Sequence, residues 1–157
     1  MEEPEVRITV VGVGNLLLKD EGIGAHTTHA LQQIDIPHNV KIVDGGTSPD
    51  LPYYLENVDK LIIIDAVKTG GQPGTIYRFH PYDMDIESEG IISLHELGLE
   101  QSLRMMRLTG NTPKETVIIG IEPKEINWGT ELSAELQQKI PEIINAVLNE
   151  ISPQLPD

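Results

Sequence analysis

A run of four large apolar residues, Leu61-Ile62-Ile63-Ile64, ends at an acidic residue, Asp65. A strand that is apolar at every position is buried on both faces, which is typical of a parallel sheet covered by helices. Four other segments rich in β-branched residues are too short for helices and predict further strands. These segments are residues 7–11, 40–43, 75–79 and 117–121. Because segment 75–79 alternates apolar and polar residues, we expect it at an edge of the sheet.

Between these strands, apolar residues recur at the spacing of an amphipathic helix. The four predicted helices begin near residue 23, at Ser48, at Ser93 and at Ser133. Ser93 and Glu96 match a capping box, and Pro141 is expected to kink or divide the last helix. Alternating strands and helices predict an α/β fold: a three-layer, mostly parallel twisted sheet of about five strands with helices on both faces. At 157 residues, we expect one domain over residues 1–157.

Composition limits the partners and the compartment. The chain has 11 basic and 25 acidic residues, which gives a formal net charge of −14. Nucleic acid or an anionic membrane would repel such a chain, so neither is expected as a partner. The absence of cysteine excludes disulfides and a thiol nucleophile, and it favours a reducing, cytoplasmic location. The acidic start of the chain does not resemble a signal peptide, and no apolar run is long enough to span a membrane.

Polar side chains follow the predicted strands at one edge of the sheet. Glu21 follows the first strand, Asp65 ends the most apolar one, and His95 lies in the first turn of a predicted helix. Because loops after parallel strands share one edge, we expect Glu21 and Asp65 to converge there, with His95 closing the group. Two carboxylates and one imidazole suit a borderline divalent ion such as nickel or zinc, and they leave coordination positions for water or substrate. Taken singly, each of the three residues is more often structural than functional.

Three other kinds of site are conceivable for this sequence. Gly12-Val13-Gly14 after a strand suggests dinucleotide binding, but Leu17 stands where the third glycine is needed. A tight turn that permits a close backbone approach is therefore the better interpretation. A Gly-x-Ser-x-Gly elbow for serine catalysis is missing from the sequence. A protease with paired carboxylates stays open, because four acids map to this edge: Asp20, Glu21, Asp44 and Asp65.

For three further side chains, the sequence predicts ordinary structural positions. His26 and His29 lie three positions apart on the first predicted helix and are expected to be ordinary surface or boundary residues. Trp128, the only tryptophan, follows the last strand in a loop, and its large apolar surface predicts a place in the core.

Several short motifs occur in a fixed order between Ile8 and Ile151. They are Gly12-Val13-Gly14-Asn15, Asp20-Glu21-Gly22-Ile23-Gly24, Asp44-Gly45-Gly46-Thr47, Ile64-Asp65-Ala66, Pro73-Gly74-Thr75, His95-Glu96-Leu97-Gly98-Leu99 and Gly120-Ile121-Glu122-Pro123. None of them is decisive alone, but the ordered set resembles the [NiFe]-hydrogenase maturation endopeptidases over most of the chain.

The resemblance implies an aspartyl-type endopeptidase. Members of this family remove a short C-terminal extension from the precursor of the hydrogenase large subunit after nickel has been inserted. The metal-binding positions of the family match Glu21, Asp65 and His95 here. The nickel would be carried by the substrate, and other divalent ions can occupy such a site. The resemblance also implies a monomer that docks transiently on the precursor.

The roles of individual groups within this resemblance stay open at several points. The ion either polarises the scissile carbonyl or activates water, or it acts only in recognition. Asp44 is an alternative general base, although an Asp before two glycines also shapes turns. The segments Gly14-Asn15 and Gly45-Gly46-Thr47 are candidates to hold the extended substrate tail. The competing hypotheses are a non-hydrolytic nickel-binding or nickel-delivery protein with the same ligands, and a small nucleotide-binding regulator that rests on Gly12 and Gly14 alone.

Overall fold

The computed structural model describes residues 5–46, 57–81, 105–110 and 112–152. The strands are β1 (Ile8–Gly12), β2 (Val40–Asp44), β3 (Lys60–Ala66), β4 (Ile76–Phe79) and β5 (Glu115–Ile121). The helices are a 3-10 turn, η1 (Lys19–Gly22), followed by α1 (Ile23–Leu31) and the long α4 (Ala134–Ile151). A further helical turn covers residues 105–109.

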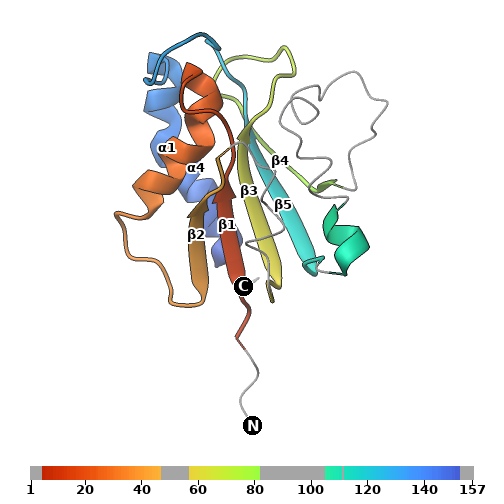
Figure 1. The fold of residues 1–157 in the computed structure, drawn as a ribbon. Coiled ribbons are helices and arrows are strands. Elements are labelled where there is room, and N and C mark those ends of the chain that lie inside the picture. Colours follow the sequence, from red (N-terminus) through yellow and green to blue (C-terminus); the bar gives the residue numbers. More distant parts are fainter. Residues whose placement is uncertain (1–4, 47–56, 82–104, 111, 153–157) are drawn as a thin grey trace.

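The strands form one five-stranded sheet in the order β2-β1-β3-β5-β4 (Figure 1). All neighbouring pairs are parallel except β4, which pairs antiparallel with β5 at the edge. The mostly parallel sheet and the edge position of segment 75–79 are therefore confirmed. All seven positions of β3 are buried, as the continuous apolar run predicts.

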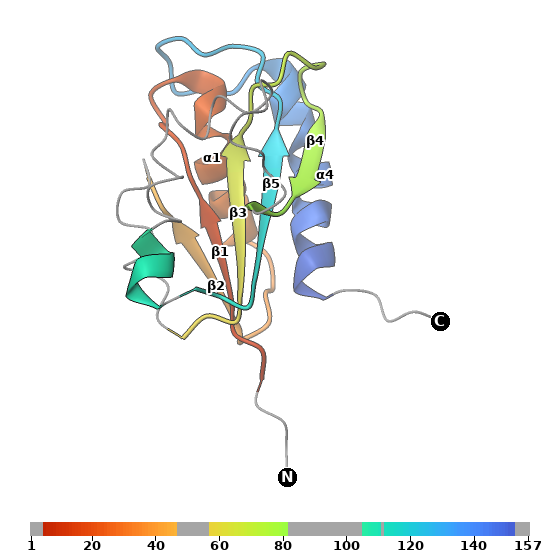
Figure 2. The same cartoon turned by 90° about the vertical axis from the view of Figure 1, so that its right-hand side faces the viewer.

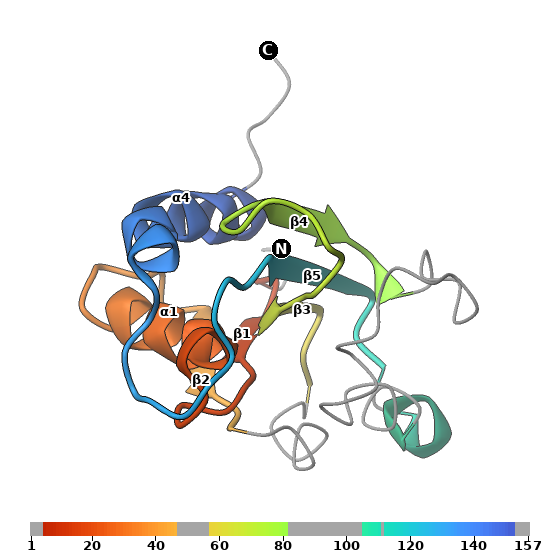
Figure 3. The same ribbon diagram turned by 90° about the horizontal axis from the view of Figure 1, so that it is seen from above.

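Helices cover both faces of the sheet. Figure 3 shows α1 and α4 on one side and the turn 105–109 on the other. Each face has its own apolar cluster, because successive side chains of a strand point to opposite faces. Ile62 and Ile64 of β3 pack on the side of α1 and α4, whereas Ile63 packs with Met106 on the opposite side. The three-layer α/β fold is confirmed, although the helix expected from Ser48 and the start of the one expected from Ser93 lie outside the described residues.

The last helix begins where its sequence predicts. Ser133 is the N-cap, and its hydroxyl oxygen accepts a hydrogen bond from the Leu136 amide. The expectation that Pro141 divides this helix is wrong, because α4 runs unbroken through it. Pro141 and Gln137, whose carbonyl loses its helical donor, are both solvent-exposed, so water can supply the missing hydrogen bond. No described helix is long and apolar enough to cross a membrane.

Candidate functional site

The carboxyl ends of the three neighbouring strands β2, β1 and β3 are tied together by backbone hydrogen bonds. The amide of Val13, just after β1, donates to the carbonyl of Ile64 in β3 at 2.9 Å. The Gly14 amide donates to the Gly46 carbonyl after β2 at 2.8 Å. These bonds fix the turn after β1 between its two neighbours, at the sheet edge where open α/β folds bind ligands.

Glycines allow η1 and α1 to approach this edge closely. Gly14 has φ +142°, and a Cβ there would lie 1.8 Å from the Glu21 carbonyl oxygen. A Cβ on Gly24 would lie 2.5 Å from the Ile64 carbonyl oxygen. Both positions therefore require glycine. The interpretation of Gly12-Val13-Gly14 as a turn for close approach is confirmed, and the group that approaches is the chain's own segment around Glu21.

Asp20 anchors this segment to a distant part of the chain. It is fully buried, and its carboxylate accepts four hydrogen bonds at 2.8 Å. The donors are the amides of Lys124, Glu125 and Ser133 and the hydroxyl of Ser133. Asp20 thus holds the loop before α4 and sets the position of its neighbour, Glu21. The sequence offers Asp20 only as a possible member of a carboxylate pair, because its partners lie more than 100 positions away.

Glu21 and Asp65 come together at this edge, as the sequence predicts. Glu21 is 9% exposed and Asp65 is completely buried. Neither carboxylate oxygen of Asp65 has a hydrogen-bond donor among the described residues. Burial raises the pKa of Asp65 well above its usual range, and the nearby Glu21 carboxylate raises it further. The Ala66 amide opposes this shift but is outweighed by burial.

A buried carboxylate without donors favours an electropositive ligand. Its ionised form is costly there, and either a proton or a cation would relieve that cost. Carboxylate oxygens from Asp65 and Glu21 are suitable ligands for a divalent ion. His95, the third predicted ligand, lies outside the described residues, and no cluster of three metal-binding side chains occurs in the part that is described. The donor set that can be described is thus compatible with the predicted metal.

Asp44 lies at the end of β2, where it shapes the turn. Its Oδ1 accepts a hydrogen bond from the Gly46 amide at 3.1 Å, and its Oδ2 lies 3.3 Å from Nε2 of His29. Gly46 has φ +57° and open space where a Cβ would stand. His29 is exposed and His26 is half-buried, in line with the prediction for both. Thr47 lies outside the described residues.

Glu122 has a structural role that sequence reasoning missed. It is buried after β5 and accepts hydrogen bonds from the amides of Thr69 and Gly71 at 3.1 Å and from the hydroxyl of Tyr77 at 2.9 Å. Burial raises the pKa of this carboxyl, but these hydrogen bonds outweigh it and lower the pKa below its usual value. Glu122 therefore holds the loop after β3. Its place directly after the apolar run of the last strand is the one sequence signal for it.

The expectation that Trp128 packs in the core is wrong. Its side chain is 79% exposed. The loop that carries Trp128 runs along the same edge as Glu21, where its backbone pairs with the segment after β1: the Gly129 amide donates to the Leu17 carbonyl at 2.9 Å. The loop's position on this rim, away from both apolar clusters, explains the exposure.

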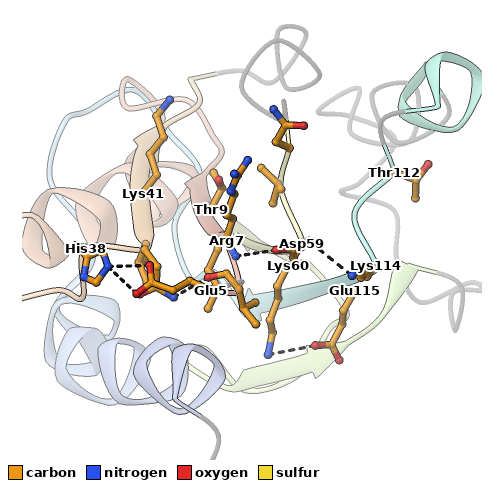
Figure 4. A pocket seen from close by; sticks show the side chains of 16 residues that line it. Glu5, Arg7, Thr9, His38, Lys41, Asp59, Lys60, Thr112, Lys114 and Glu115 are labelled. Atoms are coloured by element: carbon orange, nitrogen blue, oxygen red, sulfur yellow. Dashed lines mark hydrogen bonds and ion pairs between the residues drawn. The ribbon is translucent and has the colours of Figure 1, made fainter. Parts of the chain in front are cut away.

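A groove of about 1380 Å³ lies at the opposite edge, beside the amino ends of the strands (Figure 4). Its lining includes none of the predicted site residues. Several of its charges already have partners: Lys60 pairs with Glu115 at 3.2 Å, and Asp59 accepts from the Arg7 amide at 2.9 Å. The candidate site is therefore the Glu21–Asp65 edge, where a buried carboxylate has no donor within the described part of the chain, rather than this groove.

Comparison with known proteins identifies close relatives. The hydrogenase maturation protease family model matches residues 25–150. The hydrogenase 2 maturation protease of Escherichia coli is 37% identical over 146 residues, which cover 91% of this chain and 89% of the relative.

Solved structures give the same result. The hydrogenase maturating endopeptidase HybD of E. coli superposes with a TM-score of 0.82 at 36% identity, covering 93% of this chain and 92% of that one. The hydrogenase 2 maturation peptidase of a Thaumarchaeota archaeon has a TM-score of 0.73 at 31% identity, covering 94% and 99% of the two chains.

Proposed function

The chain belongs to the hydrogenase maturation protease family and is an endopeptidase of hydrogenase maturation, and from this premise we propose its substrate and the role of its site. The substrate is the nickel-loaded precursor of the [NiFe]-hydrogenase large subunit, and the enzyme removes the C-terminal extension of that precursor. Nickel arrives with the substrate and serves as the recognition element.

The observation that supports this proposal is the buried Asp65 carboxylate beside Glu21. Both oxygens of Asp65 lack donors among the described residues, and an ionised carboxylate is unfavourable in such an environment. A cation presented by the substrate would relieve this state. Glu21, Asp65 and His95 would fill vacant coordination positions of that cation, so a precursor without nickel would bind poorly. The metal thereby reports that insertion is complete before the extension is removed.

The cleavage step needs a water molecule directed at the scissile carbonyl. Hydrolysis adds the water oxygen to the carbonyl carbon, breaks the C–N bond and leaves the proton on the new amine. Asp44 is an exposed carboxylate at this edge and is the proposed general base, with its Oδ2 3.3 Å from Nε2 of His29. It also fixes the turn at Gly46, so its substitution would affect both proton transfer and the local backbone.

The extended tail of the substrate would lie along the ends of β1 and β2. Among the described residues no atom lies within 4 Å of a Cβ built on Gly46, which suits a close approach of substrate backbone there. Gly45 and Thr47, its neighbours in the sequence, are the other residues proposed to hold the tail. Asn15 and Gly14 contribute differently: the Gly14 amide is already bonded to Gly46, and the Asn15 side chain accepts from the Leu17 amide at 2.9 Å. These two residues would shape the entrance to the site rather than hold the tail directly.

The proposal also covers the oligomeric state and the cellular location of the enzyme. The enzyme would act as a monomer in the cytoplasm, where a chain without cysteine loses nothing to reducing conditions. A sedimentation measurement at rising concentration checks the monomer.

The test is cleavage of purified nickel-loaded precursor by site variants. Glu21→Gln, Asp65→Asn and His95→Ala should each lower kcat/KM at least about 100-fold, because a lost ligand weakens capture of the metal. His38→Ala, which removes an exposed histidine at the opposite edge, should cleave like the wild type. Mass spectrometry measures the product. Full activity of His95→Ala would overturn the ligand set, and an intact extension with the wild type would favour a nickel-delivery protein.

A further inference from the structure

Three exposed apolar side chains lie on two neighbouring segments beside the candidate site. Leu17 is 54% exposed, Ile126 is 36% exposed and Trp128 is 79% exposed. We refer to these three residues as the apolar rim. Isolated exposed hydrophobic residues are common, but a group that includes an exposed tryptophan is typical of a binding surface.

Backbone pairing brings the two segments of the apolar rim together. The Gly129 amide donates to the Leu17 carbonyl and the Lys19 amide donates to the Gly129 carbonyl, both at 2.9 Å. Figure 3 shows the loop after β1 and the loop between β5 and α4 side by side. Since segments more than 100 positions apart are bonded here, the apolar rim is a built feature of the fold.

The apolar rim is continuous with the site. Leu18, which follows Leu17, accepts a hydrogen bond at its carbonyl from the Glu21 amide at 3.1 Å. Glu21 therefore lies one helical turn after Leu18. The Asp20 side chain fixes the opposite segment through the amide of Glu125, next to Ile126. The apolar rim therefore lies directly beside the segment that carries Glu21.

Two ion pairs lie beside the apolar rim, although the chain as a whole carries −14. Lys19 pairs with Glu125 at 3.2 Å, and Lys124 pairs with Glu135. These pairs reduce the negative potential at this place, so the surface is suited to an uncharged apolar segment rather than to a basic one.

We propose that the apolar rim docks an uncharged, apolar stretch of the protein substrate next to its scissile segment. This inference rests on the proposed function, and it adds a determinant that does not involve the metal. Trp128 is the main anchor, because a large aromatic side chain offers much contact area at little conformational cost. The docking would contribute equally to substrate binding and to the transition state, so it should act on KM and leave kcat unchanged.

The kinetic test compares two exposed apolar residues. Trp128→Ala should raise KM for the nickel-loaded precursor about tenfold to hundredfold with kcat unchanged, and Trp128→Phe should recover part of the loss. Leu108→Ala is the matched control, because Leu108 is 80% exposed on the turn 105–109 near the amino ends of the strands (Figure 2). An unchanged KM for Trp128→Ala, or an equal effect of Leu108→Ala, would overturn the proposal.

A second measurement does not depend on cleavage. Trp128 is the sole tryptophan, so 5-fluorotryptophan labelling gives one fluorine resonance that reports on the apolar rim. Unlabelled precursor should shift or broaden this resonance, and the nickel-free precursor should do so at higher concentration. If the wild type cleaves while the resonance stays unchanged at saturating precursor, the docking surface is wrong and the proposed function stands. A shift that follows the enzyme's own concentration would instead assign the surface to a second copy of the chain.

Discussion

At the scale of single residues, the hydrogen-bond donors around Asp20 and Asp65 distinguish these two buried carboxylates. Asp20 and Asp65 are both completely buried at the same edge. Asp20 accepts four hydrogen bonds and stabilises a loop, whereas Asp65 has no donor among the described residues. The difference indicates a structural role for Asp20. It supports the proposed binding role of Asp65, since an unsatisfied buried carboxylate destabilises the fold unless a ligand compensates it.

This contrast predicts that Asp65→Asn stabilises the free protein. The pKa of Asp65 is raised on folding by burial, so above the pKa of the unfolded chain, about 3.9, the native state loses stability as pH rises. Below that value both states are protonated and the penalty disappears. The variant should therefore melt higher than the wild type at pH 7, by about 2–4 °C for each kcal/mol relieved, and equally at pH 3.5.

Thermal melts followed by circular dichroism at several pH values measure this difference. Asp35→Asn is the control, because Asp35 is exposed after α1 and should show no such pH-dependent gain. A lower melting temperature for Asp65→Asn at pH 7 would contradict the assignment of an unsatisfied carboxylate.

Sequence reasoning reached Glu21 and Asp65 because strand ends in a parallel sheet must share one edge. It did not identify the roles of Asp20 and Glu122. An acidic residue after a strand gives the same sequence pattern whether its carboxylate binds a ligand or accepts hydrogen bonds from amides. The partners that decide between these roles come from loops distant in sequence. Trp128 was misplaced for a related reason: its size predicts burial, but the loop that carries it lies on the rim.

At the scale of secondary-structure elements, the hydrophobic pattern was sufficient for the sheet. The continuous run in β3 and the alternation in β4 predicted a central and an edge strand, and both are confirmed. The expectation that Pro141 divides α4 considered only the lost backbone hydrogen bond and the local steric effect of proline. The packed face of α4, with Ile143 and Val147 fully buried, outweighs the loss of one hydrogen bond on the exposed face.

The contact between η1 and the start of α4 predicts that Ser133 and Asp20 are coupled in their effect on the free energy of unfolding. Ser133 caps α4 and also donates its hydroxyl to Asp20 at 2.8 Å. Ser133→Ala should cost about 1–2 kcal/mol of unfolding free energy, and Asp20→Asn should cost about 1–3 kcal/mol. Together they should cost less than the sum by about 0.5–3 kcal/mol, because the first change already removes part of the second interaction.

Urea unfolding of the four proteins in this double-mutant cycle measures the coupling. Ser152→Ala, at the other end of α4, is the matched control and should be additive with Asp20→Asn. Strict additivity of Ser133→Ala and Asp20→Asn would show that the two elements are held together by other contacts.

At the scale of the whole molecule, the amino ends and the carboxyl ends of the strands differ in the groups that they carry. The amino edge carries the large groove with its paired charges (Figure 4). The carboxyl edge carries the buried carboxylates, the glycine turn and the apolar rim. The proposed site therefore lies away from this groove, at a buried carboxylate beside two loops that are anchored by hydrogen bonds.

The central claim is that substrate-borne nickel is what the Glu21–Asp65 edge recognises. The most direct measurement is the mass of the large-subunit precursor before and after incubation with the enzyme, for nickel-loaded and nickel-free precursor in parallel. The account predicts that the loaded precursor loses the mass of its C-terminal extension while the nickel-free precursor stays intact. Equal cleavage of both forms, or of neither, would contradict it.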